Sequence, residues 1–184
     1  MSPKTSILDT FTLSHAERIM AMRDPDELIG QRGMAPYLRR WILERDDRGA
    51  VYIHEILGPD PSPETHNHPW VSSAKVLKGW YEEQRGRPYL DTPGTYVTKL
   101  HAGTVKHRRP DDWHRIQRVA PGGCITLFVT GPVLQDGWGF WCPDKGYVPK
   151  EEYVDPDNPG AIGAGCGEAL NPTPNDARTR EGFQ

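Results

Sequence analysis

Short hydrophobic segments that alternate with turn sequences run through the middle of the chain, and this spacing restricts the fold most strongly. Gly, Pro and Asp separate most of the segments, as expected for strands joined by turns. Gly (19) and Pro (18) together make about a fifth of the 184 residues, which is high for a helical protein. The pattern predicts an all-β jelly roll or sandwich and argues against βαβ units. The eight predicted strands fall at 37–43, 50–57, 70–84, 95–101, 104–109, 113–119, 124–130 and 137–142.

The two ends of the chain differ from this middle region. Residues 14–29 predict a helical start, in which Ser14 is a candidate N-cap and Glu17 follows three residues later. Pro25 interrupts this helix, and a second short turn is predicted from Asp24 to Glu27. Pro and Gly dominate the C-terminal end, where large apolar side chains are few, and this is typical of an irregular tail. We therefore expect one domain in three parts: an N-terminal helical segment at 1–35, a β-barrel at 36–154 and a tail at 155–184.

The bulk composition excludes several classes of protein. A formal net charge of -3 and a pI near 6.2 give no general attraction to nucleic acid or to anionic membranes. Mean hydropathy is -0.69, no apolar run is long enough to span a bilayer, and the N-terminus lacks the apolar core of a signal peptide. We expect a cytoplasmic protein that takes a small-molecule substrate and is compatible with a homodimer.

The three cysteines give a further restriction. Cys124, Cys142 and Cys166 are odd in number and widely spaced, and no two of them form a Cys-x-x-Cys pair. Neither a zinc ribbon nor a disulfide framework is therefore expected. Cys124 opens a predicted apolar strand and is expected in the core.

Histidines carry the main chemical signal. His66 and His68 are two residues apart, and side chains with this spacing point to the same face of a strand. Two imidazoles on one face can bind a divalent transition metal. Asp112 and His114 repeat the same spacing on a later predicted strand. Antiparallel pairing can bring the two segments together, which predicts a metal site formed by His66, His68 and His114, with Asp112 as a further candidate ligand.

At this point the sequence resembles the cupin superfamily. Its first motif is His-x-His, then a Glu four or five residues on, then a Gly; His66, His68 and Gly79 match it. The Glu position falls at Ser72 or Ser73, so the usual carboxylate ligand is missing. The resemblance covers about residues 36–142 and implies a double-stranded β-helix, that is, a jelly-roll barrel. The chain is most similar to small metal-binding cupins of bacterial and phage type.

The second cupin motif leaves the ligand set open. Pro110 and His114 match it loosely, while Asp112 lies where its turn belongs. One alternative is a three-histidine site, as in thiol-dioxygenase-like cupins; in the other, Asp112 adds a carboxylate. Asp112 is equally well explained as a residue that caps a turn. An open facial site favours Fe(II) and oxygen chemistry, whereas Zn, Mn or Ni would fit the same donors.

Further residues are candidates for contact with a substrate. Arg109 and Arg115 flank the second motif, where either can clamp an anionic group or simply form a salt bridge. Of the two adjacent glutamates at 82–83, one should face the cavity, and Glu82 is the candidate general acid or base. His54 is either a core residue or a group that faces the substrate.

Four functions are compatible with these features. The first is an Fe(II)-dependent oxygenase or hydroxylase that acts on a small polar molecule. The second is an isomerase, lyase or hydrolase in which Zn, Mn or Ni acts as a Lewis acid. The third is a module that binds a small ligand without turnover, and the fourth is a structural jelly roll. The fold alone does not decide between them.

Overall fold

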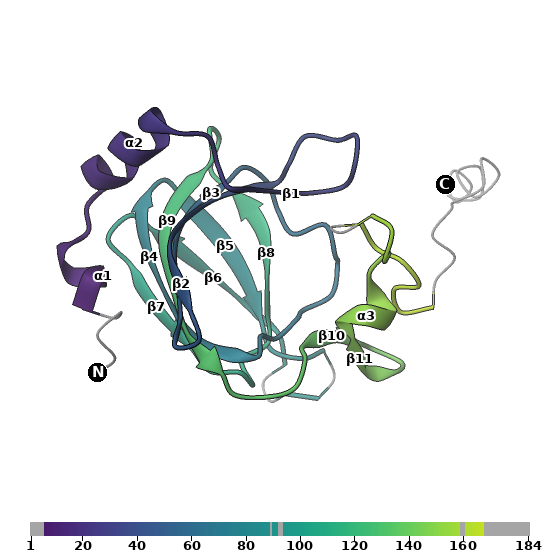
Figure 1. The fold of residues 1–184 in the computed structure, drawn as a ribbon. Coiled ribbons are helices and arrows are strands. Elements are labelled where there is room, and N and C mark those ends of the chain that lie inside the picture. Colours follow the sequence, from purple (N-terminus) through teal and green to yellow (C-terminus); the bar gives the residue numbers. More distant parts are fainter. Residues whose placement is uncertain (1–5, 89, 92–93, 159–160, 168–184) are drawn as a thin grey trace, which may run out of the picture.

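Two antiparallel sheets form the body of the protein (Figure 1). The structure is a computed structural model that describes residues 6–88, 90–91, 94–158 and 161–167. The larger sheet has, in spatial order, β1 (Glu27–Ile29), β2 (Leu38–Asp46), β3 (Gly49–Ile56), β9 (Cys124–Val133), β4 (Trp70–Lys78) and β7 (Val105–Arg108). The smaller sheet has β6 (Tyr96–His101), β5 (Trp80–Arg85) and β8 (His114–Val119).

The chain passes repeatedly from one sheet to the other. It runs through β4 in the larger sheet, β5 and β6 in the smaller, β7 in the larger, β8 in the smaller and β9 in the larger. This alternation is the double-stranded β-helix, or jelly roll, that the cupin resemblance implies, so the predicted fold class is confirmed.

The predicted strand at 70–84 is divided into β4 and β5 at Gly79. The φ angle of Gly79 is 74°, and a Cβ there would lie 2.5 Å from the carbonyl oxygen of Gly123. A residue without a side chain is therefore needed where the chain turns from one sheet into the other.

Two short helices cover the outer face of the larger sheet (Figure 1). They are α1 (Ile7–Thr10) and α2 (Leu13–Met22). Leu8, Phe11 and Ala16 are buried here against Trp41 and Ile53 of the sheet. The predicted helical start is present, and α2 ends at Met22, before the predicted interruption at Pro25. Thr12 rather than Ser14 occupies its N-cap, and β1 takes up the residues at 27–29.

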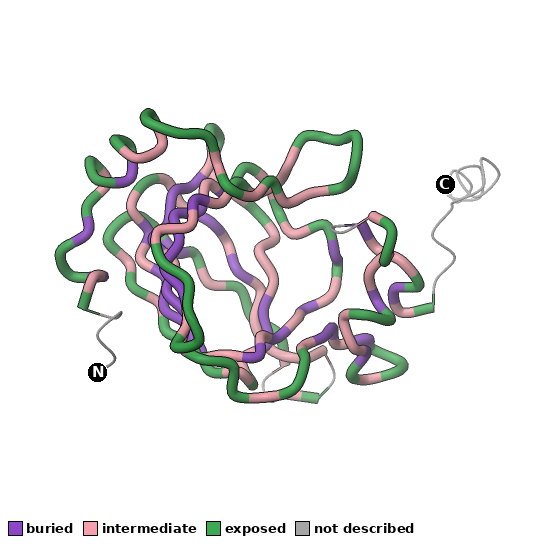
Figure 2. Tube along the Cα trace, in the orientation of Figure 1, coloured by how far each residue is buried: buried purple, intermediate pink, exposed green. Residues whose placement is uncertain are grey.

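The space between the sheets has an apolar end and a polar end. Ile56, Val76 and Cys124 of the larger sheet pack against Tyr81 and Leu100 of the smaller sheet. Cys124 is fully buried, as predicted. Figure 2 shows buried residues recurring along the strands of both sheets, which follows from the two-residue period of a strand.

A small C-terminal unit packs beside the sheets. It comprises β10 (Gly139–Cys142), β11 (Gly146–Pro149) and α3 (Lys150–Tyr153). The cysteine spacing argued against a disulfide framework, yet the structure contains a disulfide between Cys142 and Cys166, 24 residues further along. The sequence spacing did not reveal the pair because the chain folds back after α3, where Val154 pairs with Ile162.

The described part of the predicted tail, at 155–158 and 161–167, holds no regular helix or strand. Residues 168–184 of the tail lie outside the described residues. No helix among the described residues is long and apolar enough to cross a membrane.

Candidate metal centre

Three histidines from two distant parts of the sequence meet at the polar end of the jelly roll. Each offers a ring nitrogen, and these nitrogens all lie within 4.8 Å of one another. His66 pairs with His114 of β8 through two backbone hydrogen bonds of 2.9 Å. His68 lies two residues further on, and its Nε2 lies 3.0 Å from Nε2 of His114. The structure therefore brings together His66, His68 and His114, as the spacing predicts.

The protonation of these rings suits a bound cation. Burial lowers the pKa of His66 and, together with the neighbouring histidines, that of His68. Burial and the charge of Arg108 lower the pKa of His114 to about 3. All three rings are thus neutral near pH 7, and a neutral imidazole has a free lone pair for a metal.

The distances also fit one ion. Two nitrogens that each lie about 2.1 Å from an ion, at a right angle, are about 3.0 Å apart. The Nε2 atoms of His68 and His114 have this separation. In addition, Nδ1 of His66 is buried without a hydrogen-bond partner among the described residues. The donor set therefore fits a divalent transition metal, and no carboxylate belongs to the cluster within the described part of the chain.

A buried ion pair supports His114 from behind. Glu83 on β5 is fully buried. Arg108 on β7 donates to Oε1 of Glu83 from Nε, at 3.0 Å, and also from Nη2. Nδ1 of His114 approaches the same oxygen at 2.9 Å, while Oε2 has no hydrogen-bond partner in the described residues. This contact favours a proton on Nδ1 of His114 and leaves Nε2 for the metal.

The charge of Glu83 is maintained by its neighbours. Burial alone would raise its pKa, but the positive charge of Arg108 and the contact with His114 outweigh burial and hold the pKa far below the usual value. Glu83 is therefore a carboxylate, and its charge is balanced by Arg108 inside the protein.

Sequence reasoning selected the wrong neighbour in this pair of glutamates. Glu82 faces away from the histidines and lies 3.4 Å from the exposed Arg118. Tyr81 is buried between the sheets, and strand alternation gives Glu83 the same face. The sequence carried no signal for Glu83, because Trp80 and Tyr81 are both aromatic and either could have marked the buried face.

Three other predicted site residues do not join the cluster. Asp112 accepts hydrogen bonds from Nη2 of Arg85, at 3.2 Å, and from the backbone N–H of Arg109, at 2.9 Å, so it caps a turn. The side chain of Arg109 is exposed. Arg115 alternates with the inward-facing His114 and donates to the carbonyl of Pro63. Arg108, which the sequence did not single out, lies inside instead.

His54 also lies between the sheets. It is buried, and its Nε2 accepts a hydrogen bond of 2.9 Å from Nε of Arg40. Its ring stacks against those of Tyr52 and Phe128, at centroid distances of 5.6 and 4.9 Å. Burial lowers its pKa well below the usual value. These contacts match the core reading of His54 that the sequence left open.

Aromatic rings close one side of the histidine cluster. Trp138 lies 5.8 Å from the ring of His66 and 5.7 Å from that of His68. Phe140 on β10 lies 5.7 Å from His66 and stacks on Tyr153 of α3. The C-terminal unit thus excludes water from one side of the site.

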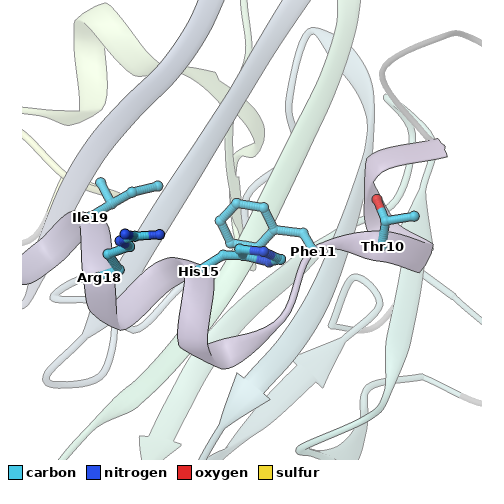
Figure 3. A pocket seen from close by; sticks show the side chains of 5 residues that line it. All are labelled: Thr10, Phe11, His15, Arg18 and Ile19. Carbon is cyan, nitrogen blue, oxygen red and sulfur yellow. The ribbon is translucent and has the colours of Figure 1, made fainter.

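A separate open pocket of about 270 Å³ lies at the N-terminal helices (Figure 3). Phe11, His15 and Ile19 line it together with Thr10 and Arg18. None of the predicted site residues lies in this pocket, so it is unrelated to the histidine cluster.

No model of a protein family and no curated protein matches the chain. Among solved structures, an uncharacterised conserved Klebsiella pneumoniae protein with a double-stranded β-helix domain is 22% identical, with a TM-score of 0.45 over 62% of this chain and 91% of that one. The Fe(II) form of HppE with substrate is 18% identical, with a TM-score of 0.44 over 59% and 58% of the two chains. The DMSP lyase DddQ from Ruegeria pomeroyi is 16% identical, with a TM-score of 0.42 over 59% and 55%.

Proposed function

We propose that the protein is a metal-dependent enzyme in which His66, His68 and His114 hold Fe(II), and that it is an oxygenase or hydroxylase acting on a small polar molecule. The observation that carries the proposal is the pair of neutral Nε2 atoms of His68 and His114 at 3.0 Å, inside a cluster of three histidines. Three protein ligands leave positions open for other molecules, as in catalytic rather than structural sites.

The chain itself contributes orientation and exclusion of water. Oε1 of Glu83, which Arg108 holds in place, lies 2.9 Å from Nδ1 of His114, so the carboxylate would favour a proton on Nδ1 and leave Nε2 for the metal. Trp138 and Phe140 cover the rings of His66 and His68, and a drier site strengthens electrostatic interactions within it. Fe(II) bound by the histidines would supply electrons for reaction with oxygen.

A non-redox function is the second candidate, and the neutral ligand set favours it. Three neutral imidazoles without a carboxylate are also the ligands of a catalytic zinc, which acts as a Lewis acid and activates water. In that case the protein would be an isomerase, lyase or hydrolase that uses Zn, Mn or Ni.

Metal analysis of protein purified without a histidine tag separates the two candidates. One iron per chain and oxygen consumption with a substrate would support the first candidate. One zinc or nickel per chain without oxygen consumption would support the second. If His66→Ala and His114→Ala leave the metal content unchanged, both candidates are wrong.

A further inference from the structure

Two buried hydrogen-bond donors that follow His68 along the chain have no partner in the part of the chain that the structure describes. Nε1 of Trp70 and Oγ of Ser72 are both buried, and neither has a hydrogen-bond partner among the described residues. Ser72 is 4% exposed. A buried donor without a partner costs free energy of about 1–3 kcal/mol, so such a group in a native protein calls for a ligand or a water molecule.

These donors follow a metal-ligand candidate along one face of the chain. His68, Trp70 and Ser72 are spaced two residues apart, and the rings of His68 and Trp70 stack with centroids 5.6 Å apart. A β-bulge lies beside these residues, where β4 pairs with β9. Trp70 pairs with Val133 and Ser72 with Thr130, so the extra residue of the bulge is on β9. The alternation of side chains along β4 is therefore unchanged, and Trp70 and Ser72 share a face.

Ser72 faces the interior, and its neighbour Ser73 does not. Ser72 pairs with the inward-facing Arg108, whereas Oγ of Ser73 lies 2.7 Å from Nδ1 of the exposed His107. Of these two serines, Ser72 is therefore the one that faces the interior next to Arg108, the partner of Glu83.

The charges around the site also favour an anion. Histidine binds a metal as a neutral imidazole and adds no charge. Glu83 is paired with Arg108, and Asp60 and Arg115 shift the pKa of His66 in opposite directions. Glu27 is shared by two cations, because Arg40 and Arg45 each lie 2.8 Å from it. A divalent metal would therefore add positive charge that no described carboxylate in the cluster offsets. Burying uncompensated charge is costly, so an anionic ligand is favoured.

We propose that the site takes a small carboxylate anion whose oxygens accept hydrogen bonds from Oγ of Ser72 and Nε1 of Trp70 beside the metal. This inference rests on the proposed metal site and specifies its ligand class. The carboxylate supplies the negative charge that the three-histidine set lacks, and it satisfies the two donors at the same time.

Calorimetric titration of the zinc-loaded full chain with malonate tests the proposal, with the uncharged malonamide as the comparison ligand. We expect Ser72→Ala and Trp70→Phe each to weaken malonate binding roughly tenfold or more, because a hydrogen bond to a charged group is lost. Trp70→Phe keeps an aromatic ring next to His68. Malonamide should bind at least roughly tenfold more weakly than malonate in the wild type.

Ser73→Ala is the matched control. It makes the same substitution one residue away, at a serine that faces His107, and should leave the affinity for malonate unchanged. Ser72→Ala removes a buried hydroxyl without a partner in the described residues, so the ligand-free variant should be at least as stable to heat as the wild type. Stability therefore shows whether a loss of binding comes from misfolding.

The outcomes separate this inference from the proposed function. If the wild type holds one zinc per chain, and the Ser72→Ala and Trp70→Phe variants bind malonate as tightly as the wild type does, the anion site is wrong and the metal site stands. Equal affinity for malonate and malonamide would also overturn it. If the wild type holds no metal, the proposed function fails. If the metal-free wild type binds malonate and the Ser72→Ala variant does not, that result would still support the anion site.

Discussion

Replacing Glu83 with Gln removes a charge that lies at the centre of the site. Glu83 is fully buried, its Oε1 accepts from Arg108, and it contacts Nδ1 of His114. Gln has nearly the same shape, so the substitution changes charge and hydrogen bonding while leaving little cavity. Arg108, which is 5% exposed in this pair, would then be a buried cation without its counter-charge.

The expected loss of stability follows from leaving the charge of Arg108 buried without a counter-charge. Removing one partner of a buried ion pair costs about 3–5 kcal/mol of unfolding free energy. A typical domain has about 5–15 kcal/mol in total, so Glu83→Gln should be strongly destabilised. Because the pKa of Glu83 in the folded protein lies below the 4.5 of an ordinary Glu, this stabilisation is present above a pH of about 4.5 and is lost as the pH falls further.

Urea unfolding of the metal-free variants at pH 7 measures the effect. Glu82→Gln is the matched control: its partner Arg118 is 68% exposed, and such a pair contributes less than about 1 kcal/mol. The double variant Glu83→Gln/Arg108→Met should lose less unfolding free energy than the sum of the losses in Glu83→Gln and Arg108→Met, because no buried charge remains unpaired. If Glu83→Gln and Glu82→Gln are equally stable, the buried ion pair does not have the role described.

Three further predictions concern other parts of the fold. Burial lowers the pKa of His54 and of the three clustered histidines. As the pH falls below about 6.5, the unfolding free energy of the metal-free protein should therefore fall by up to about 1.4 kcal/mol per pH unit for each of these histidines. A constant unfolding free energy between pH 7 and 5 would contradict this. Cys142→Ser breaks the bond to Cys166 and should lower stability by about 3 kcal/mol in non-reducing buffer, with no difference once the wild type is reduced. Gly79→Ala places a Cβ 2.5 Å from a carbonyl oxygen at a φ of 74° and should lower the unfolding free energy by more than about 1 kcal/mol. Gly103 also has a positive φ but has open space around it, so thermal unfolding should show a smaller loss for Gly103→Ala.

Local spacing was enough to predict much of the fold and the histidine cluster. Turn residues between short apolar segments predicted the strands, because strand length and turn chemistry are local properties. The two-residue period of a strand predicted that His66 and His68 share a face, and pairing with β8 then brought in His114. The carboxylate that the first motif lacks is not replaced by Asp112, which is held by Arg85 and a backbone N–H.

Contacts between distant elements were beyond the reach of spacing. Glu83 and Arg108 come from different sheets, and 25 residues separate them. The choice between adjacent glutamates depends on which face of β5 is buried, and that face is set by packing rather than by local sequence. The disulfide was missed for the same reason, since Cys142 and Cys166 meet only where the chain folds back after α3.

Equilibrium metal binding to the untagged protein tests the central claim most directly. The chain should bind one divalent metal ion, and His66→Ala, His68→Ala and His114→Ala should each lose it. The matched control His107→Ala changes a histidine that is exposed and contacts Ser73, and it should bind the metal as the wild type does. Wild-type stoichiometry and affinity in all four variants would contradict the account.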